Sequence, residues 1–483
     1  MKKSSVAANY IYNVAYQILT FLTPIITAPY LSRTLGADNL GKFNYTYSIV
    51  YWFILFGTMG ISLYGSKEIA KVSNDREKLS KKFSEIFSLQ FLCTLISLII
   101  YYFVFLTFDF KYHMVFLLQG GMLLSSMFEI TWFYIGLENF KKTTIRGFIV
   151  KLLMVSGILL LVHNENDLYL YMTFIIIMNV IGSLMIWVGI NKIIDFKIPK
   201  FKDIVPHFKE NFVLFIPQIS SSIYSVFDQT MIGLLYDDIS EVGFYTQAHK
   251  LVNMLMFIIT TIGTVMLPNI VRKKSEKNDD TVKLITNNTF KIALFLSIPI
   301  AIGFSVVSPF FIPWFLPKDF GKVAYIICCL TPTIVFISLT NVFGMQYLIV
   351  NDESKKYTIS VTSGCVVNVV LNALLIGQFG AYGAAFASSI TELVILLIQY
   401  HFVKKTFNFD GIIKKIFTYL GVGILMGAGA LGVGLVMGSG ILTNIVQVLV
   451  GMLIYFGILF IMHDDIEHFL IDKFLVTFRL KKK

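Results

Sequence analysis

The sequence predicts an all-α polytopic membrane protein with 14 transmembrane helices, arranged as two pseudo-symmetric six-helix lobes plus two C-terminal helices. Of its 483 residues, 56% are hydrophobic and 14% are charged, a composition outside the range of soluble globular proteins. Apolar runs of about 20 residues, long enough to cross a hydrocarbon layer of about 30 Å, recur along the chain. The Lys and Arg residues gather in alternate connections between these runs, as expected when one side of a membrane is cytoplasmic.

Each apolar run lies between charged or glycine-containing breaks. The first, which follows the basic start Met1-Lys-Lys, is too long for a signal-peptide core and predicts a retained helix. The segment between the first two runs, residues 33–42, reads as a polar turn containing Gly36 and Gly41. The expected helices span residues 9–32, 43–66, 83–108, 113–136, 147–162, 169–190, 212–235, 243–271, 286–312, 323–350, 358–377, 381–403, 415–437 and 441–462.

Charge asymmetry predicts the orientation. Of the 40 Lys and Arg residues, only five fall in connections on the side opposite the termini: Arg33, Lys42, Lys111, Lys318 and Lys322. Three more fall within expected helices, namely Lys151, Lys250 and Lys291. All others lie on the side of the termini, which is therefore predicted to be cytoplasmic. In a soluble protein the net charge of +11 would raise the question of nucleic acid, but here we expect no nucleic-acid partner.

A weak internal repeat predicts the domain organisation. Two outer hairpins end in similar sequences, Gly41-Lys-Phe-Asn-Tyr45 and Gly243-Phe-Tyr245, and each is followed by a long helix and a basic connection. Because six helices separate the copies, the repeat is parallel, with its axis along the membrane normal. We expect an N-terminal lobe at residues 1–190, a cytoplasmic linker at 191–211, a C-terminal lobe at 212–403, and the last two helices with a cytoplasmic tail at 404–483.

Signatures of catalysis and cofactor binding do not stand out. The sequence has no Walker A loop and no evident catalytic triad or paired carboxylates. The four cysteines lie inside apolar runs without disulfide or zinc spacing. We therefore expect a protein that is not an enzyme and needs no cofactor or metal. A membrane glycosyl-polymerase would need a sizeable outer loop, and the expected outer connections are short.

Ionisable residues inside apolar helices are the candidate functional residues, because burying a charge in hydrocarbon is costly. Asp228 lies seven residues before the outer end of one expected helix, and Lys250 lies seven residues after the outer start of the next. At 1.5 Å per residue both lie about 10 Å below the outer edge. The two residues either form a structural ion pair or face a substrate cavity, and the sequence does not decide between these readings.

Three further groups have open roles. Glu392 lies near the middle of its helix, and the preceding helix supplies Asn368 and Asn372. This carboxyl group either binds a coupling H⁺ or Na⁺ or is a protonated acid in the packing. Arg33 either meets a substrate phosphate through its planar guanidinium or lies among lipid phosphates. Glu129 and Lys151 are predicted to form a neighbouring pair.

Prolines are expected to bend several helices where a neighbour or a wet cavity satisfies the freed carbonyl groups. Glycines of the span at 415–437 suit close helix contacts. The prolines concerned are Pro24, Pro29, Pro217, Pro268, Pro299, Pro309 and Pro332.

Several motifs resemble bacterial polysaccharide-unit flippases, the Wzx-type branch of the multidrug/oligosaccharidyl-lipid/polysaccharide exporter superfamily. The resemblance covers nearly the whole chain. It rests on Asn9-Tyr-Ile-Tyr-Asn13, Pro29-Tyr-Leu-Ser-Arg-Thr-Leu-Gly-Ala37, Gly41-Lys-Phe-Asn-Tyr45, Gly60-Ile-Ser-Leu-Tyr-Gly65, Lys67-Glu-Ile-Ala-Lys71, Ser225-Val-Phe-Asp-Gln-Thr-Met-Ile-Gly233, Gly243-Phe-Tyr-Thr-Gln-Ala-His-Lys-Leu251 and Phe379-Gly-Ala-Tyr-Gly-Ala-Ala385.

The resemblance implies two six-helix bundles that open alternately to each face of a bacterial plasma membrane. The implied substrate is an undecaprenyl-diphosphate-linked oligosaccharide, moved to the outer leaflet for capsule, exopolysaccharide or another surface polysaccharide. Arg33, Asp228 and Lys250 are the candidate substrate-binding residues, with membrane lipids, a polymerase and glycosyltransferases as further partners. Such flippases tend to use cationic cavity residues, and only Arg33 and Lys250 match here, which disfavours a strongly acidic repeat unit.

Two alternatives share the same fold. An H⁺- or Na⁺-coupled multidrug antiporter would favour an acidic, aromatic cavity, whereas Arg33 and Lys250 are cationic. A lipid II flippase fits the N-terminal motif less well.

Overall fold

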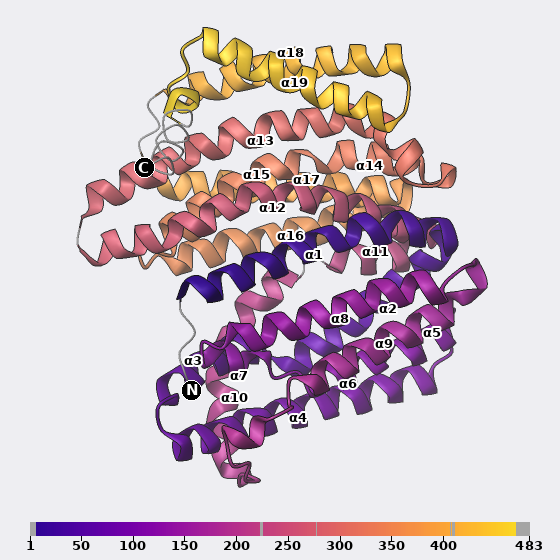
Figure 1. Ribbon diagram of the computed structural model, residues 1–483, viewed down its shortest axis with the longest axis vertical. Helices are drawn as coiled ribbons and strands as arrows, with labels where there is room; N and C mark the ends of the chain where they lie inside the picture. Colours follow the sequence, from indigo (N-terminus) through magenta and orange to yellow (C-terminus); the bar gives the residue numbers. More distant parts are fainter. Residues whose placement is uncertain (1–5, 223–225, 277, 406, 408–410, 470–483) are drawn as a thin grey trace. The chain divides into compact units, whose positions relative to one another are not determined.

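The computed structural model describes residues 6–222, 226–276, 278–405, 407 and 411–469. The chain divides into two compact units, Met1–Gly243 and Phe244–Lys483, and each is described by itself. Every regular element among these residues is a helix (Figure 1). The predicted all-α fold class is therefore confirmed.

The helices of the first unit follow the apolar runs of the sequence. Their bounds are α1 Val6–Thr34, α2 Gly36–Thr58, α3 Ile61–Val72, α4 Arg76–Thr107, α5 His113–Gln119, α6 Gly121–Met127, α7 Thr131–Gly136, α8 Phe140–Leu161, η1 Glu165–Asp167, α9 Leu168–Met185, η2 Ile190–Lys192, α10 Phe201–Ser222 and α11 Asp228–Leu235, with α12 (Ser240–Ser275) crossing into the second unit.

The predicted turn at residues 33–42 is present but much shorter than expected, because helix α1 ends at Thr34 and helix α2 already begins at Gly36. A single left-handed residue, Gly36 with φ 74°, reverses the chain after α1, and only glycine adopts this conformation without a steric penalty. Gly41 lies inside α2, where a Cβ atom would overlap the backbone carbonyl of Ile239. The glycine at position 41 therefore serves close packing, not a turn.

Two predicted spans of the first unit are interrupted. The expected helix at 43–66 breaks between α2 and α3, where Met59 and Gly60 both have positive φ, 45° and 81°. The expected helix at 113–136 divides into α5, α6 and α7. Neither break contains a proline, so the apolar pattern gave no sign of them.

Aromatic rings fill the core between α4, α7 and the chain after α9. The ring of Phe83 meets that of Phe133 edge-on with centroids 4.8 Å apart, and Phe87 meets Trp187 in the same way at 4.7 Å. Trp132 is buried and donates its ring N–H to Oε1 of Gln90 over 2.8 Å. These contacts fix α7 against α4.

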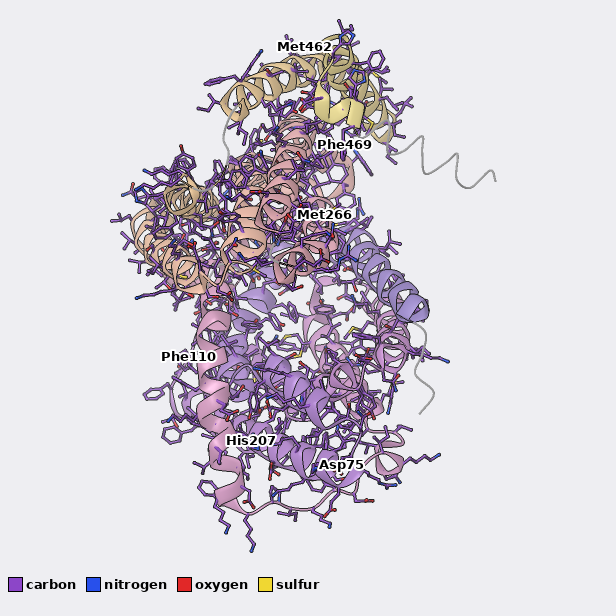
Figure 2. The ribbon with its side chains drawn as sticks, turned by 90° about the vertical axis from the view of Figure 1, so that its left-hand side faces the viewer. Asp75, Phe110, His207, Met266, Met462 and Phe469 are labelled. Carbon is purple, nitrogen blue, oxygen red and sulfur yellow. The ribbon has the colours of Figure 1, made fainter. Side chains whose placement is uncertain are left out.

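Helix α10 packs on α3 and α4, and a buried polar cluster joins the three helices. His207, labelled on α10 in Figure 2, lies 2.9 Å from Oε2 of Glu85 and 2.6 Å from the hydroxyl of Tyr64. Tyr64 donates to Oε2 of Glu210 over 3.1 Å. The predicted linker at 191–211 thus becomes helical from Phe201 onward.

The second unit contains the longest helix of the described residues, α13 (Asp279–Phe315), with 37 residues. Beyond α12 and α13, the bounds of its helices are η4 Lys318–Phe320, α14 Lys322–Leu330, α15 Pro332–Asn341, η5 Val342–Leu348 (a π-helical turn), α16 Ser354–Phe379, α17 Ala381–Val403, α18 Ile412–Met437 and α19 Ile441–Ile461.

Helices α18 and α19 lie side by side along α13 (Figure 1). A Cβ atom on Gly423 would come within 2.8 Å of Ile302 on α13, and one on Gly427 within 3.0 Å of the same residue. Gly429 faces Ile454 of α19. The prediction that glycines of this span permit close helix contacts is confirmed at these three positions, whereas Gly421 and Gly432 have open space around them.

The described residues contain 11 helices long and apolar enough to cross a membrane, or 12 if the bent pair formed by Lys318–Leu330 and Pro332–Leu348 is one span. That pair bends by 41°, which confirms the bend expected at Pro332. The remaining predicted spans, at residues 9–32 and 212–235, overlap α1 and α10 to α11, which are not among these candidates. The exact count of 14 stays a prediction.

Candidate functional site

Arg33 and Asp228, two of the three predicted substrate-binding residues, belong to the first unit. Arg33 is exposed in the last turn of α1. Asp228 opens α11 and is only 1% exposed. Helix α11 packs on α2 through a polar contact two residues further on, where the hydroxyl of Thr230 donates to that of Ser48 over 2.8 Å. A buried carboxylate therefore lies at the start of a polar seam between α11 and α2.

Lys250, the third residue, belongs to the second unit and is exposed on α12. Its chain neighbour His249 contacts the side-chain amide of Asn253 over 3.1 Å, and the ring of Tyr245 stacks on His249 with centroids 5.7 Å apart. Because Asp228 and Lys250 lie in different units, their predicted pairing stays a prediction.

Glu392, the predicted ion-coupling residue, is half-buried on α17, which packs along α16. Asn368 and Asn372 of α16 are buried, and the amide of Asn372 donates to Oδ1 of Asn368 over 3.1 Å. Thr391, the chain neighbour of Glu392 on α17, is also buried. Both helices thus bury polar side chains inside the second unit, and a coupling role for Glu392 stays a prediction.

A chamber of about 310 Å³ with both polar and apolar walls lies within the first unit, at the broken helices. Aromatic and apolar side chains contribute part of its wall, and hydroxyl, amide and carboxyl groups contribute the rest. The lining residues are Tyr47, Ile54, Thr58, Gly60, Ile61, Ser62, Gln90, Met122, Ser125, Ser126, Glu129, Thr131, Trp132 and Asn179. The breaks between α2 and α3 and between α6 and α7 both open onto this chamber.

The carboxylate of Glu129 is held at the chamber wall by several donors. It accepts the backbone N–H of Thr131 over 2.9 Å and the Thr131 hydroxyl. It also pairs with Nη1 of Arg146 on α8 over 2.7 Å. The sequence predicted Lys151 as its neighbour, whereas the partner seen at Glu129 is Arg146. A pairing with Lys151 stays untested.

Arg146, the cationic member of this ion pair, lines a groove of about 400 Å³. Cationic and apolar side chains of α8 share its wall with Met185 of α9. Its lining residues are Asn139, Lys141, Lys142, Ile145, Arg146, Ile149 and Met185. Because Glu129 lines the chamber and Arg146 lines the groove, their ion pair connects the walls of the two cavities.

Sequence reasoning missed this pair because its members lie on different helices and follow no local spacing rule. The charge pattern predicts only that Arg146 lies on the cytoplasmic side. The available signal was Glu129 itself, an acid in an apolar run that requires a partner. Among the residues described, no three His, Cys, Asp or Glu side chains gather into a group that could hold a metal ion.

Two protein-family models match the chain. The model described as polysaccharide biosynthesis protein matches residues 6–274, and the model of the lipid II flippase MurJ matches residues 149–456. The chain is 22% identical to a candidate O-antigen transporter of Escherichia coli (strain K12) over 415 residues, which cover 83% of this chain and 97% of that protein. It is 24% identical to a candidate low-salt glycan biosynthesis flippase of Haloferax volcanii over 275 residues, 56% of each chain.

The fold is similar to a solved structure of the lipid II flippase MurJ in an inward closed conformation. The TM-score is 0.75 at 17% sequence identity, with 95% of this chain and 99% of that chain covered. At this identity the likeness shows a shared fold alone. Since the first family model matches more than half of the chain, the chain belongs to the polysaccharide biosynthesis protein family, in the Wzx-type flippase branch of the multidrug/oligosaccharidyl-lipid/polysaccharide exporter superfamily.

Proposed function

We propose that this chain moves undecaprenyl-diphosphate-linked oligosaccharide repeat units from the cytoplasmic to the outer leaflet of a bacterial plasma membrane. The observation that carries the proposal is the match to a candidate O-antigen transporter over 97% of that protein's length. A flippase must hide sugar hydroxyls and a diphosphate from hydrocarbon while the prenyl tail stays in lipid. Polar cavities inside a bundle of apolar helices suit this task.

Alternating access is the proposed mechanism, with lobes at residues 1–190 and 212–403 rocking about the substrate. The product would be a surface polysaccharide such as capsule or exopolysaccharide, and a polymerase and glycosyltransferases would act beside the flippase. Both termini are proposed to be cytoplasmic. The gathering of Lys and Arg in alternate connections supports this orientation.

Arg33 and Lys250 are the proposed cationic contacts for the diphosphate, and Asp228 is the proposed acceptor for sugar hydroxyl groups. The exposure of both cations supports a role in contacting a ligand. Glu392 is the proposed site for a coupling H⁺ or Na⁺. The packing of its helix, α17, along α16, which carries the buried Asn368 and Asn372, supports a polar environment for such an ion.

The cellular test replaces Lys250 by Gln and Asp228 by Asn in separate variants. We expect either substitution to abolish surface polysaccharide while the protein still reaches the membrane. Lys274→Gln, at the end of the same helix as Lys250, is the matched control and should leave polysaccharide normal. Normal surface polysaccharide in both the Lys250 and the Asp228 variant would show that neither residue is needed for substrate binding.

A lipid II flippase is the second candidate, supported by the match of the MurJ family model over residues 149–456. The two functions differ in the substrate head group, because lipid II carries a peptide on its disaccharide. Proteoliposomes containing the full chain should flip a fluorescent prenyl-diphosphate oligosaccharide without peptide, and should not flip a peptide-bearing disaccharide lipid. The reverse selectivity would favour the lipid II function.

A further inference from the structure

The groove beside the first half of α8 has a composition that fits a charged lipid head. We propose that it binds the diphosphate of the lipid-linked sugar, with the prenyl chain along Ile145 and Ile149 and the first sugar in the adjoining chamber. The inference rests on the proposed function, because it names a site for the substrate of that function. It adds a second site, within the first unit alone, to Arg33, Asp228 and Lys250.

Charge complementarity is the first argument. Lys141, Lys142 and Arg146 line the groove, and Glu129 balances one of these cations through its pair with Arg146. Two positive charges remain in excess, which matches the two negative charges of a diphosphate bonded to a lipid and a sugar. Basic pockets between transmembrane helices bind phosphate-bearing lipid heads in this way.

The three cations are held differently. Nζ of Lys142 donates to the hydroxyl of Tyr134 over 2.6 Å and to the carbonyl oxygen of Val188 over 2.7 Å, so its position is fixed. Lys141 is exposed, and its flexible side chain can follow a ligand. Nε of Arg146 is buried without a hydrogen-bond partner among the residues that the structure describes. A phosphate oxygen would supply that missing acceptor.

An apolar strip is the second argument. Ile145 is 42% exposed and Ile149 is 38% exposed, and both follow Lys141 along α8 at helical spacing. Met185 of α9 faces the same groove. A lipid whose head lies at the three cations can therefore lay its chain along Ile145 and Ile149 without leaving the hydrocarbon.

The chamber across the ion pair is the third argument, and it favours a sugar-bearing lipid over an ordinary anionic phospholipid. Oε2 of Glu129 and Nη1 of Arg146 are 2.7 Å apart, so a ligand at Arg146 is one side chain away from the chamber. Hydroxyl and amide groups of Ser62, Ser125 and Asn179 line that chamber. Its volume of about 310 Å³ lies at the lower end of the range for small-molecule pockets.

The binding experiment uses the full chain in nanodiscs of phosphatidylcholine and native mass spectrometry to measure Kd. The probe is undecaprenyl diphosphate bearing one N-acetylglucosamine. We expect the double variant Lys141→Gln/Arg146→Gln to weaken binding at least about tenfold, because it removes two charged phosphate contacts. Lys209→Gln, an exposed cation on α10 outside the groove, should bind like the wild type. Unchanged binding in the double variant would overturn the proposal.

Ile149→Trp provides a variant that keeps every charge. The larger side chain fills the groove and should reduce binding of the probe to a similar degree, with the thermal midpoint of unfolding unchanged. Undecaprenol, which has the same chain without phosphate, should not distinguish the double variant from the wild type. If phosphatidylglycerol displaces the probe at equal concentration, the groove is a general site for anionic lipids and the proposal fails.

Asn179→Leu tests the chamber separately. The apolar side chain should remove the preference for the sugar-bearing probe over undecaprenyl diphosphate alone, while binding of the bare diphosphate stays unchanged. A retained preference would place the sugar elsewhere and overturn that part of the proposal.

Flipping in proteoliposomes separates the failure of this site from the failure of the proposed function. If the wild type flips the probe and the groove variants bind and flip it equally well, the proposed binding site is wrong and the proposed flippase function is supported. If the wild type binds the probe through the groove but never flips it, the proposed function is wrong and the binding site is supported.

Discussion

At the residue scale, His207 joins three helices of the first unit through hydrogen bonds. It is 5% exposed and lies between the carboxylate of Glu85 and the hydroxyl of Tyr64, which in turn donates to Glu210. Nε2 of the ring contacts the carboxylate of Glu85 on α4, and Nδ1 contacts the hydroxyl of Tyr64 on α3. One buried ring on α10 therefore connects the three helices.

Replacing His207 by Ala should lower the free energy of unfolding by about 2 kcal/mol, because the buried Glu85 loses its short hydrogen bond. Lys81 and Lys82 stay near this carboxylate, at the longer distances of 3.9 and 3.7 Å. The measurement is the thermal midpoint of unfolding of the purified protein in detergent. His463→Ala, at an exposed position after α19, is the control. Equal midpoints in the two variants would show that the cluster does not hold α10 in place.

Asp75, labelled at the start of α4 in Figure 2, is a pH-sensitive helix cap. Its carboxylate accepts the backbone N–H groups of Lys78 and Glu77, each over 3.1 Å. These hydrogen bonds, with the side chain of Lys78, lower the pKa of Asp75 below its usual value. The cap therefore stabilises the helix at pH values above the pKa of an aspartate in the unfolded chain, about 3.9. This stabilisation is lost as the pH falls through the lower pKa that Asp75 has in the folded protein.

We expect amide hydrogen exchange at Glu77 and Lys78 to lose protection as the pH falls below about 4. In Asp75→Asn, the amide oxygen still accepts hydrogen bonds but cannot be protonated in this range. Protection factors in that variant should therefore stay constant with pH. A wild type whose protection does not change at acidic pH would contradict the role of the carboxylate.

At the element scale, the first unit contains a direct backbone contact between α2 and the start of α12. A Cβ atom on Gly41 would overlap the carbonyl of Ile239, and one on Gly243 would come within 2.5 Å of the carbonyl oxygen of Ala37. Glycine at both positions lets the two segments touch. The similar sequences around Gly41 and Gly243, first read as matching hairpins, thus also form one packed contact.

Gly41→Ala should destabilise the protein by about 1–3 kcal/mol, because a backbone carbonyl cannot move aside as a flexible side chain can. Gly432→Ala is the matched control. It lies inside α18 with open space around it, and alanine is a better helix former than glycine. The control should leave the thermal midpoint unchanged or raise it. A Gly41 variant as stable as the wild type would show that the backbone of the two segments shifts to accommodate the added methyl group at little cost.

Apolar length predicted the membrane helices well and their interruptions poorly. Helix α17 has the predicted bounds, residues 381 and 403, because a glycine precedes it and basic residues follow it. The left-handed pair Met59 and Gly60, by contrast, lies in a run that is apolar on both sides. Hydropathy reports what the membrane requires of a segment, and it does not report backbone turns that packing imposes.

At the scale of the whole molecule, the same limit applies to the candidate site. The sequence alone identifies the ionisable residues within apolar runs, namely Asp228, Lys250, Glu392 and Glu129. Their partners depend on which helices are neighbours. Thr230 meets Ser48 across 182 positions of sequence, and no pattern in one chain encodes that contact. The pair of Glu129 with Arg146 was missed for this reason.

Orientation in the membrane is the last property that the charge pattern predicts for the whole molecule. The connection between α8 and α9, residues 162–167, should face outward, and the segment before α10, which includes Lys200, should face the cytoplasm. Both positions are exposed, so a cysteine introduced at either one should react readily.

The test replaces Cys93, Cys328, Cys329 and Cys365 by Ser and then adds Asn164→Cys or Lys200→Cys separately. A membrane-impermeant maleimide should label the Asn164 variant in intact cells and the Lys200 variant only after permeabilisation. The opposite pattern would invert the chain in the membrane, and it would place the groove cations Lys141, Lys142 and Arg146 at the outer leaflet, where they would serve release of the lipid head instead of its capture.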